Sequence, residues 1–375
     1  MHLYNLSLKK STAIVHSVLG NFSGGKGQEI LVATTDSLEL FSVCAETGKL
    51  QSMVARQTFS HIRGLVPFRV PGSSKGTLLH FLLLYLILID YIVVTSDGGR
   101  IVVLSFDTAT HSFTKVHQET FGKTGLRRIV AGQFLTADPK GRAVMLAAPE
   151  KQKLVYILNR DSKGGLMIYS PLEANRSNSV TLALAGVDVG FENPIFAAIE
   201  IDYESKEKHL VYYELDLGLN HVVRKWNSSV KQTANHLIAL PGGTDGPSGV
   251  LVCSENEITW MHQNRPSVRI PIPRRPASHR RNPGVMVTTS AVHKLKKGFF
   301  VFLQTEEGDI FKITVDFTPL NPDGSGENAV QEMRIRYLDT TSVCVALNVL
   351  KSGFLWGAAE CGDRLVSSLL LQLIC

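Results

Sequence analysis

A short structural unit recurs along this chain of 375 residues, and its spacing constrains the fold more than any other feature. Each copy is an apolar, β-branched run, a polar turn and a second such run, which is the pattern of a β-hairpin. Seven copies are recognisable, and they begin at Gln28, Asp90, Gly141, Asn193, Ser248, Gly298 and, in the most degenerate form, Ser352. A period of about 50 residues built from hairpins predicts four-stranded antiparallel blades. We therefore expect an all-β, seven-bladed β-propeller of the WD40-like type, as a single domain over residues 1–375.

The turns of two hairpins support this fold. The sequences SDGG (Ser96–Gly99) and EEGD (Glu306–Asp309) place glycine where a tight hairpin needs a positive φ angle. A TIM barrel or a doubly wound sheet would instead need crossover helices of about ten or more residues between its strands. The segments between the hairpins do not show such helices, so the sequence favours antiparallel blades over either α/β fold.

The most hydrophobic segment is GTLLHFLLLYLILIDYIVV, from Gly76 to Val94. Its last five residues, DYIVV, continue into a hairpin, so we interpret them as a strand. The remaining residues, Gly76–Ile89, widen the first interval between copies, and we interpret them as an apolar insertion at a blade edge. They fall short of the roughly twenty residues that span a bilayer. A membrane-tethered protein anchored by residues 77–94 is the alternative, although that span would contain Asp90.

No catalytic residue, cofactor site or small-molecule substrate is predicted, because neither a G-x-S-x-G nor an H-E-x-x-H motif is present. The five scattered cysteines form no Cys/His cluster with metal-ligand spacing, and they suit a reducing, intracellular compartment. GNFSGGKG (Gly20–Gly27) nearly matches a phosphate-binding loop. However, Gly27 replaces the required hydroxyl residue, and a strand rather than a helix is predicted to follow.

Aromatic residues and two basic segments are the remaining candidates for binding. Tyr212, Tyr213, Trp226 and Trp260 alternate with apolar residues, which favours packing inside blades over a ligand cage. The net charge of +6 is weak evidence for a nucleic-acid partner. Residues 271–283 carry four arginines among prolines, and we favour a solvated loop there over a phosphate-contacting patch or a nuclear-import signal. Residues 121–133 read equally well as a docking loop and as a salt-bridged surface loop.

Several long segments resemble the N-terminal region of the splicing factor 3B subunit 3 family. They include NFSGGKGQEI from Asn21, HQETFGKTGLRRIVAGQFLTADPKGRAVM from His117, GVDVGFENP from Gly186, YELDLGLNHVVRK from Tyr213 and PGGTDGPSGVLVCSEN from Pro241. The resemblance extends from residue 1 to about residue 360. The wider family includes the damaged-DNA-binding protein large subunit and the cleavage and polyadenylation specificity factor large subunit.

The resemblance implies a non-enzymatic scaffold subunit of the SF3b complex of the U2 snRNP, located in the nucleus, that supports branch-site recognition in pre-mRNA splicing. It implies a HEAT-repeat subunit and small subunits of that complex as partners, with RNA contact at most indirect and no membrane. A DNA-damage-binding, ubiquitin-ligase adaptor type of propeller is the alternative within the wider family. The residues that we expect to contact partners are Arg127, Arg128, Gln133, Asn159, Arg160, Tyr213, Asn220 and Arg224.

The chain also departs from the family pattern. Gly76–Ile89 has no counterpart in the family, and the pattern is lost over residues 362–375. The second and third propellers that full-length members carry are not expected in this chain. A propeller usually closes by pairing its last blade with strands from the other chain end, so the sequence leaves closure open and predicts an unpaired sheet edge where the pattern is lost.

Overall fold

The computed structural model describes residues 12–367, apart from residues 26, 45, 48, 59, 71–88, 123–131, 162–164, 264, 275–283, 297, 320–327 and 360–363. The described residues form β-strands and one 3-10 turn, η1 (Gly243–Asp245), and their strand pairs are antiparallel. They assemble into seven sheets of three to five strands, numbered here in chain order. The prediction of an all-β chain with four-stranded antiparallel sheets is confirmed, although two of the described sheets have five strands and one has three.

The first four sheets occupy the N-terminal part of the described chain. Sheet 1 contains β1 (Ile14–Gly20), β2 (Glu29–Thr34), β3 (Ser37–Val43) and β4 (Leu50–Gln57). Sheet 2 contains β5 (Ile62–Phe68), β6 (Tyr91–Ser96), β7 (Arg100–Asp107) and β8 (Ser112–Thr120). Sheet 3 contains β9 (Phe134–Ala137), β10 (Ala143–Ala147) and β12 (Lys153–Arg160), with the short strands β13 (Leu166–Ile168) and β14 (Leu172–Glu173) both paired to β12. Sheet 4 contains β11 (Glu150–Lys151), β15 (Arg176–Val187), β16 (Ile195–Asp202), β17 (Lys208–Asp216) and β18 (His221–Ser229).

The other three sheets follow in chain order. Sheet 5 contains β19 (His236–Ala239), β20 (Val250–Ser254), β21 (Glu257–Met261) and β22 (Val268–Pro271). Sheet 6 contains β23 (Val287–Lys294), β24 (Phe299–Thr305), β25 (Asp309–Pro319) and β26 (Asn328–Thr340). Sheet 7 contains β27 (Cys344–Val349), β28 (Leu355–Ala359) and β29 (Arg364–Ser367).

The seven hairpins predicted from the repeat are all present. They are β2–β3, β6–β7, β10–β12, β16–β17, β20–β21, β24–β25 and the degenerate last copy, β28–β29. Two turn glycines adopt the predicted conformation, with φ of +67° at Gly99 and +83° at Gly308. The alternation of apolar residues along each strand, together with the residues of the turns, therefore predicted the position of each hairpin correctly.

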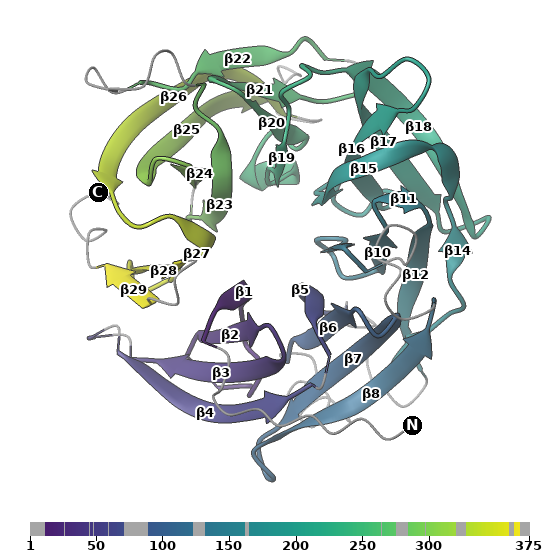
Figure 1. The fold of residues 1–375 in the computed structure, drawn as a ribbon, viewed down its shortest axis with the longest axis vertical. Coiled ribbons are helices and arrows are strands. Elements are labelled where there is room, and N and C mark those ends of the chain that lie inside the picture. The colour runs from purple at the N-terminus through teal and green to yellow at the C-terminus, as the bar shows by residue number, and fades with distance from the viewer. Residues whose placement is uncertain are drawn as a thin grey trace, which may run out of the picture.

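The sheets stand around a common centre (Figure 1), with β1, β5, β19, β23 and β27 toward the inside and β4, β8, β18, β22 and β26 toward the outside. Apolar side chains of neighbouring sheets pack against each other, which removes both faces of the central strands from water. The last sheet packs on the first, where the fully buried Trp356 joins a cluster with Ile14 and Ile30. The side-chain amide of Asn348 also donates to the hydroxyl of Ser17, at 2.5 Å.

The two atypical segments of the sequence are only partly described. The predicted strand after the apolar stretch is confirmed, because β6 begins at Tyr91. Asp90 precedes it, and its carboxylate accepts from the backbone N–H of Asn21 and pairs with Arg69 at 2.7 Å. The proposed insertion, apart from Ile89, and most of residues 362–375 lie outside the described residues. Within the part of the chain that is described, no helix is long and apolar enough to cross a membrane.

Candidate protein interaction surface

The outer edges of sheets 3 and 4 form one continuous surface. In Figure 1, β14 lies between β12 and β18, and the contacts of the chain confirm that β14 packs on β18. β13 and β14 pair in turn with the outer edge of β12, through Asn159 with Met167 and Val155 with Leu172. Leu172 and Leu217 pack against the same buried cluster, so the two sheets share a core beneath this edge. We call this surface the rim; its exposed residues are Asn159, Met167, Tyr169, Leu219, Asn220, Val223 and Arg224.

Exposed apolar side chains are frequent on the strands and turns of the rim. Four of the ten large hydrophobic residues that are exposed in the described part of the chain lie here: Met167, Tyr169, Leu219 and Val223. Leu219 is the most exposed of the four, at 78%. Grouped exposed apolar residues with a polar border are typical of protein interaction sites. The rim therefore has the composition of a protein-binding surface.

The predicted contact residues of segments 159–182 and 213–225 fall on or beside the rim, with one exception that is described below. Asn159 is exposed near the end of β12, and its side-chain oxygen accepts from the backbone N–H of Arg160. Arg160 is half-buried and donates to the backbone carbonyl of Val70, which ties sheet 3 to the segment after β5. Asn220 is exposed in the turn between β17 and β18, where its φ is +50°, and Arg224 is exposed on β18.

The remaining predicted contacts are placed differently. Gln133 is half-buried immediately before β9, and Arg127 and Arg128 lie outside the described residues. The prediction that Tyr213 contacts a partner is wrong in this structure, because only 3% of the residue is exposed. Its hydroxyl donates to the carboxylate of Glu200 at 2.7 Å inside the protein. The interpretation of Tyr213 as a packing residue is the correct one, and Trp260 is similarly buried, at 1% exposed.

Beneath the rim, a buried ion pair joins sheets 3 and 4. Lys153 of β12 lies 3.2 Å from Glu200 of β16, with 1% and 4% of the two side chains exposed. Burial lowers the pKa of Lys153, and the neighbouring Glu200 opposes that shift. This pair was not predicted from the sequence. The available signal was a charged residue within a largely apolar strand, as Glu200 is in β16.

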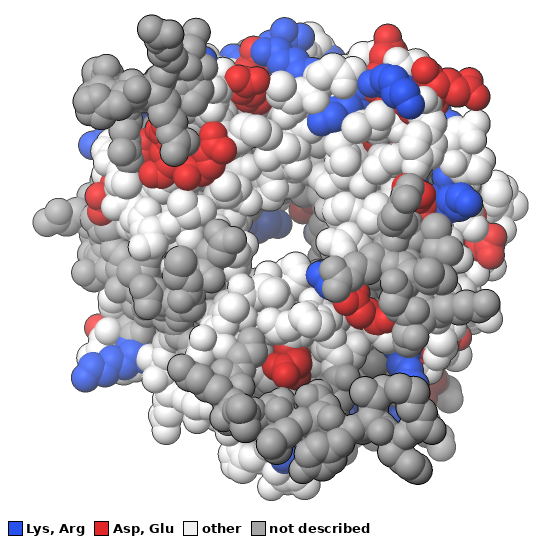
Figure 2. Space-filling view, in the orientation of Figure 1, with Lys and Arg blue, Asp and Glu red and all other residues white. Residues whose placement is uncertain are grey.

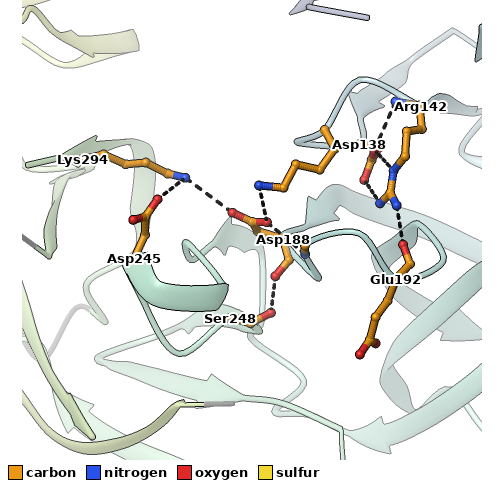
Figure 3. Close-up of polar contacts among 9 residues, drawn as sticks. Asp138, Arg142, Asp188, Glu192, Asp245, Ser248 and Lys294 are labelled. Carbon is orange, nitrogen blue, oxygen red and sulfur yellow. Dashed lines mark hydrogen bonds and ion pairs between the residues drawn. The ribbon is translucent and has the colours of Figure 1, made fainter. Parts of the chain in front are cut away.

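A second polar network links loops of sheets 3, 4 and 5 to strand β23 of sheet 6 (Figure 3). Asp188 lies 3.9 Å from the ammonium of Lys140 and 3.4 Å from that of Lys294, and its backbone carbonyl accepts from Ser248. Burial opposes ionisation of Asp188, but the backbone N–H of Gly242 and the two lysines outweigh it and lower its pKa. This network orders the loops that follow β9, β15 and β19.

The same region holds a bidentate pair within sheet 3. The guanidinium of Arg142 contacts both carboxylate oxygens of Asp138, at 2.8 and 3.0 Å. It also donates to the backbone carbonyl of Glu192, at 2.5 Å, so the pair connects sheets 3 and 4 (Figure 3). The contacts of Asp138 and Arg142 are thus satisfied by the protein itself, and we assign them a structural role.

Neither the face drawn in Figure 2 nor the loop that resembles a phosphate-binding motif has the features of a nucleic-acid or phosphate site among the described residues. Figure 2 shows Lys and Arg interspersed with Asp and Glu on one face, rather than forming the basic stripe typical of nucleic-acid binding. In the loop that resembles a phosphate-binding motif, the backbone N–H groups of Phe22 and Ser23 donate to the carboxylate of Glu29. A strand, β2, follows this loop as predicted, so the loop lacks the helix that would hold a phosphate. Among the described residues, no group of His, Cys, Asp and Glu could hold a metal ion.

The comparison with known families decides the classification. The model of the RSE1/DDB1/CPSF1 first beta-propeller matches residues 13–372. The chain belongs to this family. Its members named for splicing are close in sequence over almost the whole chain: Spliceosome-associated protein 130 A of Arabidopsis thaliana is 50% identical over 97% of the chain, and Splicing factor 3B subunit 3 of Danio rerio is 48% identical over 97%. Pre-mRNA-splicing factor RSE1 of Mycosarcoma maydis is 46% identical over 98% of it.

The match covers only part of these relatives. The chain spans 29% of the Arabidopsis and Danio proteins and 30% of the Mycosarcoma protein. The family model describes a first beta-propeller and matches residues 13–372, which accounts for the β-propeller pattern of this chain.

Proposed function

We propose that this chain is a non-enzymatic scaffold module of a splicing factor 3B subunit 3 type protein, acting in the SF3b complex of the U2 snRNP during pre-mRNA splicing. The family model covers both the splicing proteins and the damaged-DNA-binding protein, so it does not distinguish between these two roles. The relatives that are 46–50% identical are named for splicing, and their names support the splicing role. The proposed site of action is the nucleus, where splicing takes place. The observation that carries the proposal is the rim, a surface suited to protein partners.

The proposed module is a seven-bladed propeller in which each sheet is one blade. The innermost strands contact one another in succession around the centre, and β27 of sheet 7 contacts β1 of sheet 1. Burial of Trp356 between these sheets supplies an apolar seam between the first and last blades. We therefore propose that packing between the first and last blades contributes to closure of the ring.

The proposed partners of the rim are the HEAT-repeat subunit and the small subunits of the SF3b complex, with contact to RNA made only through the assembled particle. Leu219 and Met167 supply exposed apolar area, and Asn159, Asn220 and Arg224 supply polar groups around it. Apolar residues at the centre of an interface and polar residues at its border are the usual arrangement.

Co-expression with the HEAT-repeat subunit tests the proposal. The chain should co-purify with that subunit, and Leu219→Ser combined with Met167→Ser should reduce the recovered complex. Tyr337→Ser is the matched control, because Tyr337 is 49% exposed on the outer strand of sheet 6. Failure of the chain to co-purify, both with and without residues 76–89, would refute the scaffold function; failure of the longer form alone would implicate the inserted segment. Binding to a ubiquitin-ligase cullin instead would establish the adaptor alternative.

A further inference from the structure

A polar hollow of about 260 Å³ lies against sheet 4, beside the rim. Its lining includes Arg176 and Ser179 of β15, Glu200 and Asp202 of β16, His209 of β17 and Arg224 of β18. Strand register explains why these residues meet, since Ser179 pairs with Asp202, Glu200 with His209, and Arg224 with Tyr213. The hollow is therefore built by four adjacent strands of one sheet.

Several hydrogen-bond donors in the hollow have no acceptor among the residues that the structure describes. The side chains of Arg176 and Arg224 form no ion pair and no hydrogen bond with any residue that the structure describes. Ser179 is 3% exposed, and its hydroxyl oxygen has no hydrogen-bond partner in the described part of the chain. The Nδ1 atom of His209 is likewise buried without a partner there. A buried hydroxyl that forms no hydrogen bond costs free energy, which a bound acceptor would recover.

Two of the three acidic residues of the hollow are engaged within the protein, and the third, Glu204, is exposed. Glu200 accepts from the hydroxyl of Tyr213 and pairs with the buried Lys153. One carboxylate oxygen of Asp202 accepts from the backbone N–H groups of Glu204 and Ser205, and these bonds lower the pKa of Asp202. The donors that line the hollow without an acceptor among the described residues are the guanidinium groups of Arg176 and Arg224 and the hydroxyl of Ser179.

From these contacts we infer that the hollow binds the carboxylate of an acidic side chain on a partner protein. Arginine binds carboxylates through charge-assisted, often bidentate, hydrogen bonds, and Ser179 would supply a further donor. A carboxylate fits better than a phosphate, because the carboxylates of Glu200, Asp202 and Glu204 would repel a doubly charged phosphate more strongly than a singly charged carboxylate. The inference rests on the proposed scaffold function, because it assigns a specific acidic contact beside the protein-binding rim.

Fluorescence anisotropy with a labelled peptide containing a run of glutamates tests this inference on the full chain. The glutamate peptide should bind, and its glutamine counterpart should not. Arg176→Gln and Arg224→Gln should each weaken binding roughly tenfold, as expected for the loss of one charge-assisted contact. Arg336→Gln should leave binding unchanged, because Arg336 is exposed on the outer strand β26 and lies away from the hollow.

A second variant separates binding from folding. Ser179→Ala removes a buried hydroxyl that has no partner, so it should preserve or raise the melting temperature while it weakens peptide binding. Unchanged affinity in the Arg176→Gln/Arg224→Gln double variant would overturn the inference, as would tighter binding of a phosphoserine peptide than of the glutamate peptide. If the HEAT-repeat subunit is still recovered normally when either of these results is found, the inference about the hollow fails but the scaffold function stands. Peptide binding at the two arginines without recovery of that subunit would support the hollow and refute the scaffold function.

Discussion

The ammonium of Lys153 lies 3.2 Å from the carboxylate of Glu200, and this pair crosses from sheet 3 to sheet 4 inside the protein. The hydroxyl of Tyr213 donates to the same carboxylate, which leaves Glu200 well satisfied despite its burial. Two charges removed from water are stable only when each compensates the other. The pair therefore fixes how these two sheets fit together beneath the rim.

Removal of one partner should destabilise the fold more than removal of both. Lys153→Met leaves Glu200 charged, buried and without its cation, and we expect it to lower the free energy of unfolding by about 3–5 kcal/mol. Glu200→Gln combined with Lys153→Met retains an acceptor for Tyr213 and should recover most of that loss. Urea denaturation of both variants and of Glu200→Gln completes a double-mutant cycle. Additive effects of the two single changes would show that the ion pair contributes no coupling.

The bidentate pair of Asp138 and Arg142 should matter more for stability than the neighbouring exposed contact of Asp245. Asp138→Asn leaves a guanidinium whose side chain is 12% exposed without its anion, which should cost about 3 kcal/mol. Asp245→Asn is the matched control, because its side chain is 59% exposed and meets Lys294 at 3.5 Å. Such surface pairs contribute about 1 kcal/mol or less. Equal shifts in the urea midpoint for the two variants would contradict this ranking.

Mild acid should destabilise the protein through its buried histidines. Burial lowers the pKa of His236 to about 4, and it also lowers those of His16, His262 and His293. Between the unfolded-state pKa near 6.5 and the folded-state value, the unfolded chain binds a proton that the folded chain excludes. Stability is therefore complete above about pH 6.5 and declines as the pH falls toward 4. For His236 alone the decline amounts to about 3 kcal/mol.

Urea unfolding measured from pH 7 to pH 4 tests this acid sensitivity. His236→Gln retains a hydrogen-bonding group for Ser290, which lies 2.9 Å from the histidine ring nitrogen. This variant should show a shallower fall of stability with falling pH than the unaltered chain does. His221→Gln, at an exposed position on β18, serves as the control. An identical pH slope for His236→Gln and the unaltered chain would exclude His236 as a source of the effect.

The hairpins could be predicted from the sequence because their signals are local. Alternating apolar residues define each strand, and turn residues such as Gly99 define where it reverses. It was harder to predict which side chains of a strand reach the protein surface, as Tyr213 shows. β17 is packed between two other sheets, so residues on both of its faces are buried and alternation does not reveal which one reaches a surface. The ion pair of Lys153 with Glu200 joins residues far apart in the sequence, and no local pattern records that contact.

The final prediction concerns Gly308, which turns the chain between β24 and β25 with a φ of +83°. A Cβ atom there would lie 2.1 Å from the backbone carbonyl oxygen of Thr341, so Gly308→Ala combines a strained backbone with a steric clash. Gly298→Ala separates the two effects, because Gly298 has a φ of +81° and no heavy atom within 4 Å of the added Cβ. We expect Gly298→Ala to cost about 1–2 kcal/mol, the strain of a left-handed residue. Gly308→Ala should cost clearly more, because the backbone of Thr341 must also move. Thermal unfolding of the two variants would contradict this if their melting temperatures fell equally.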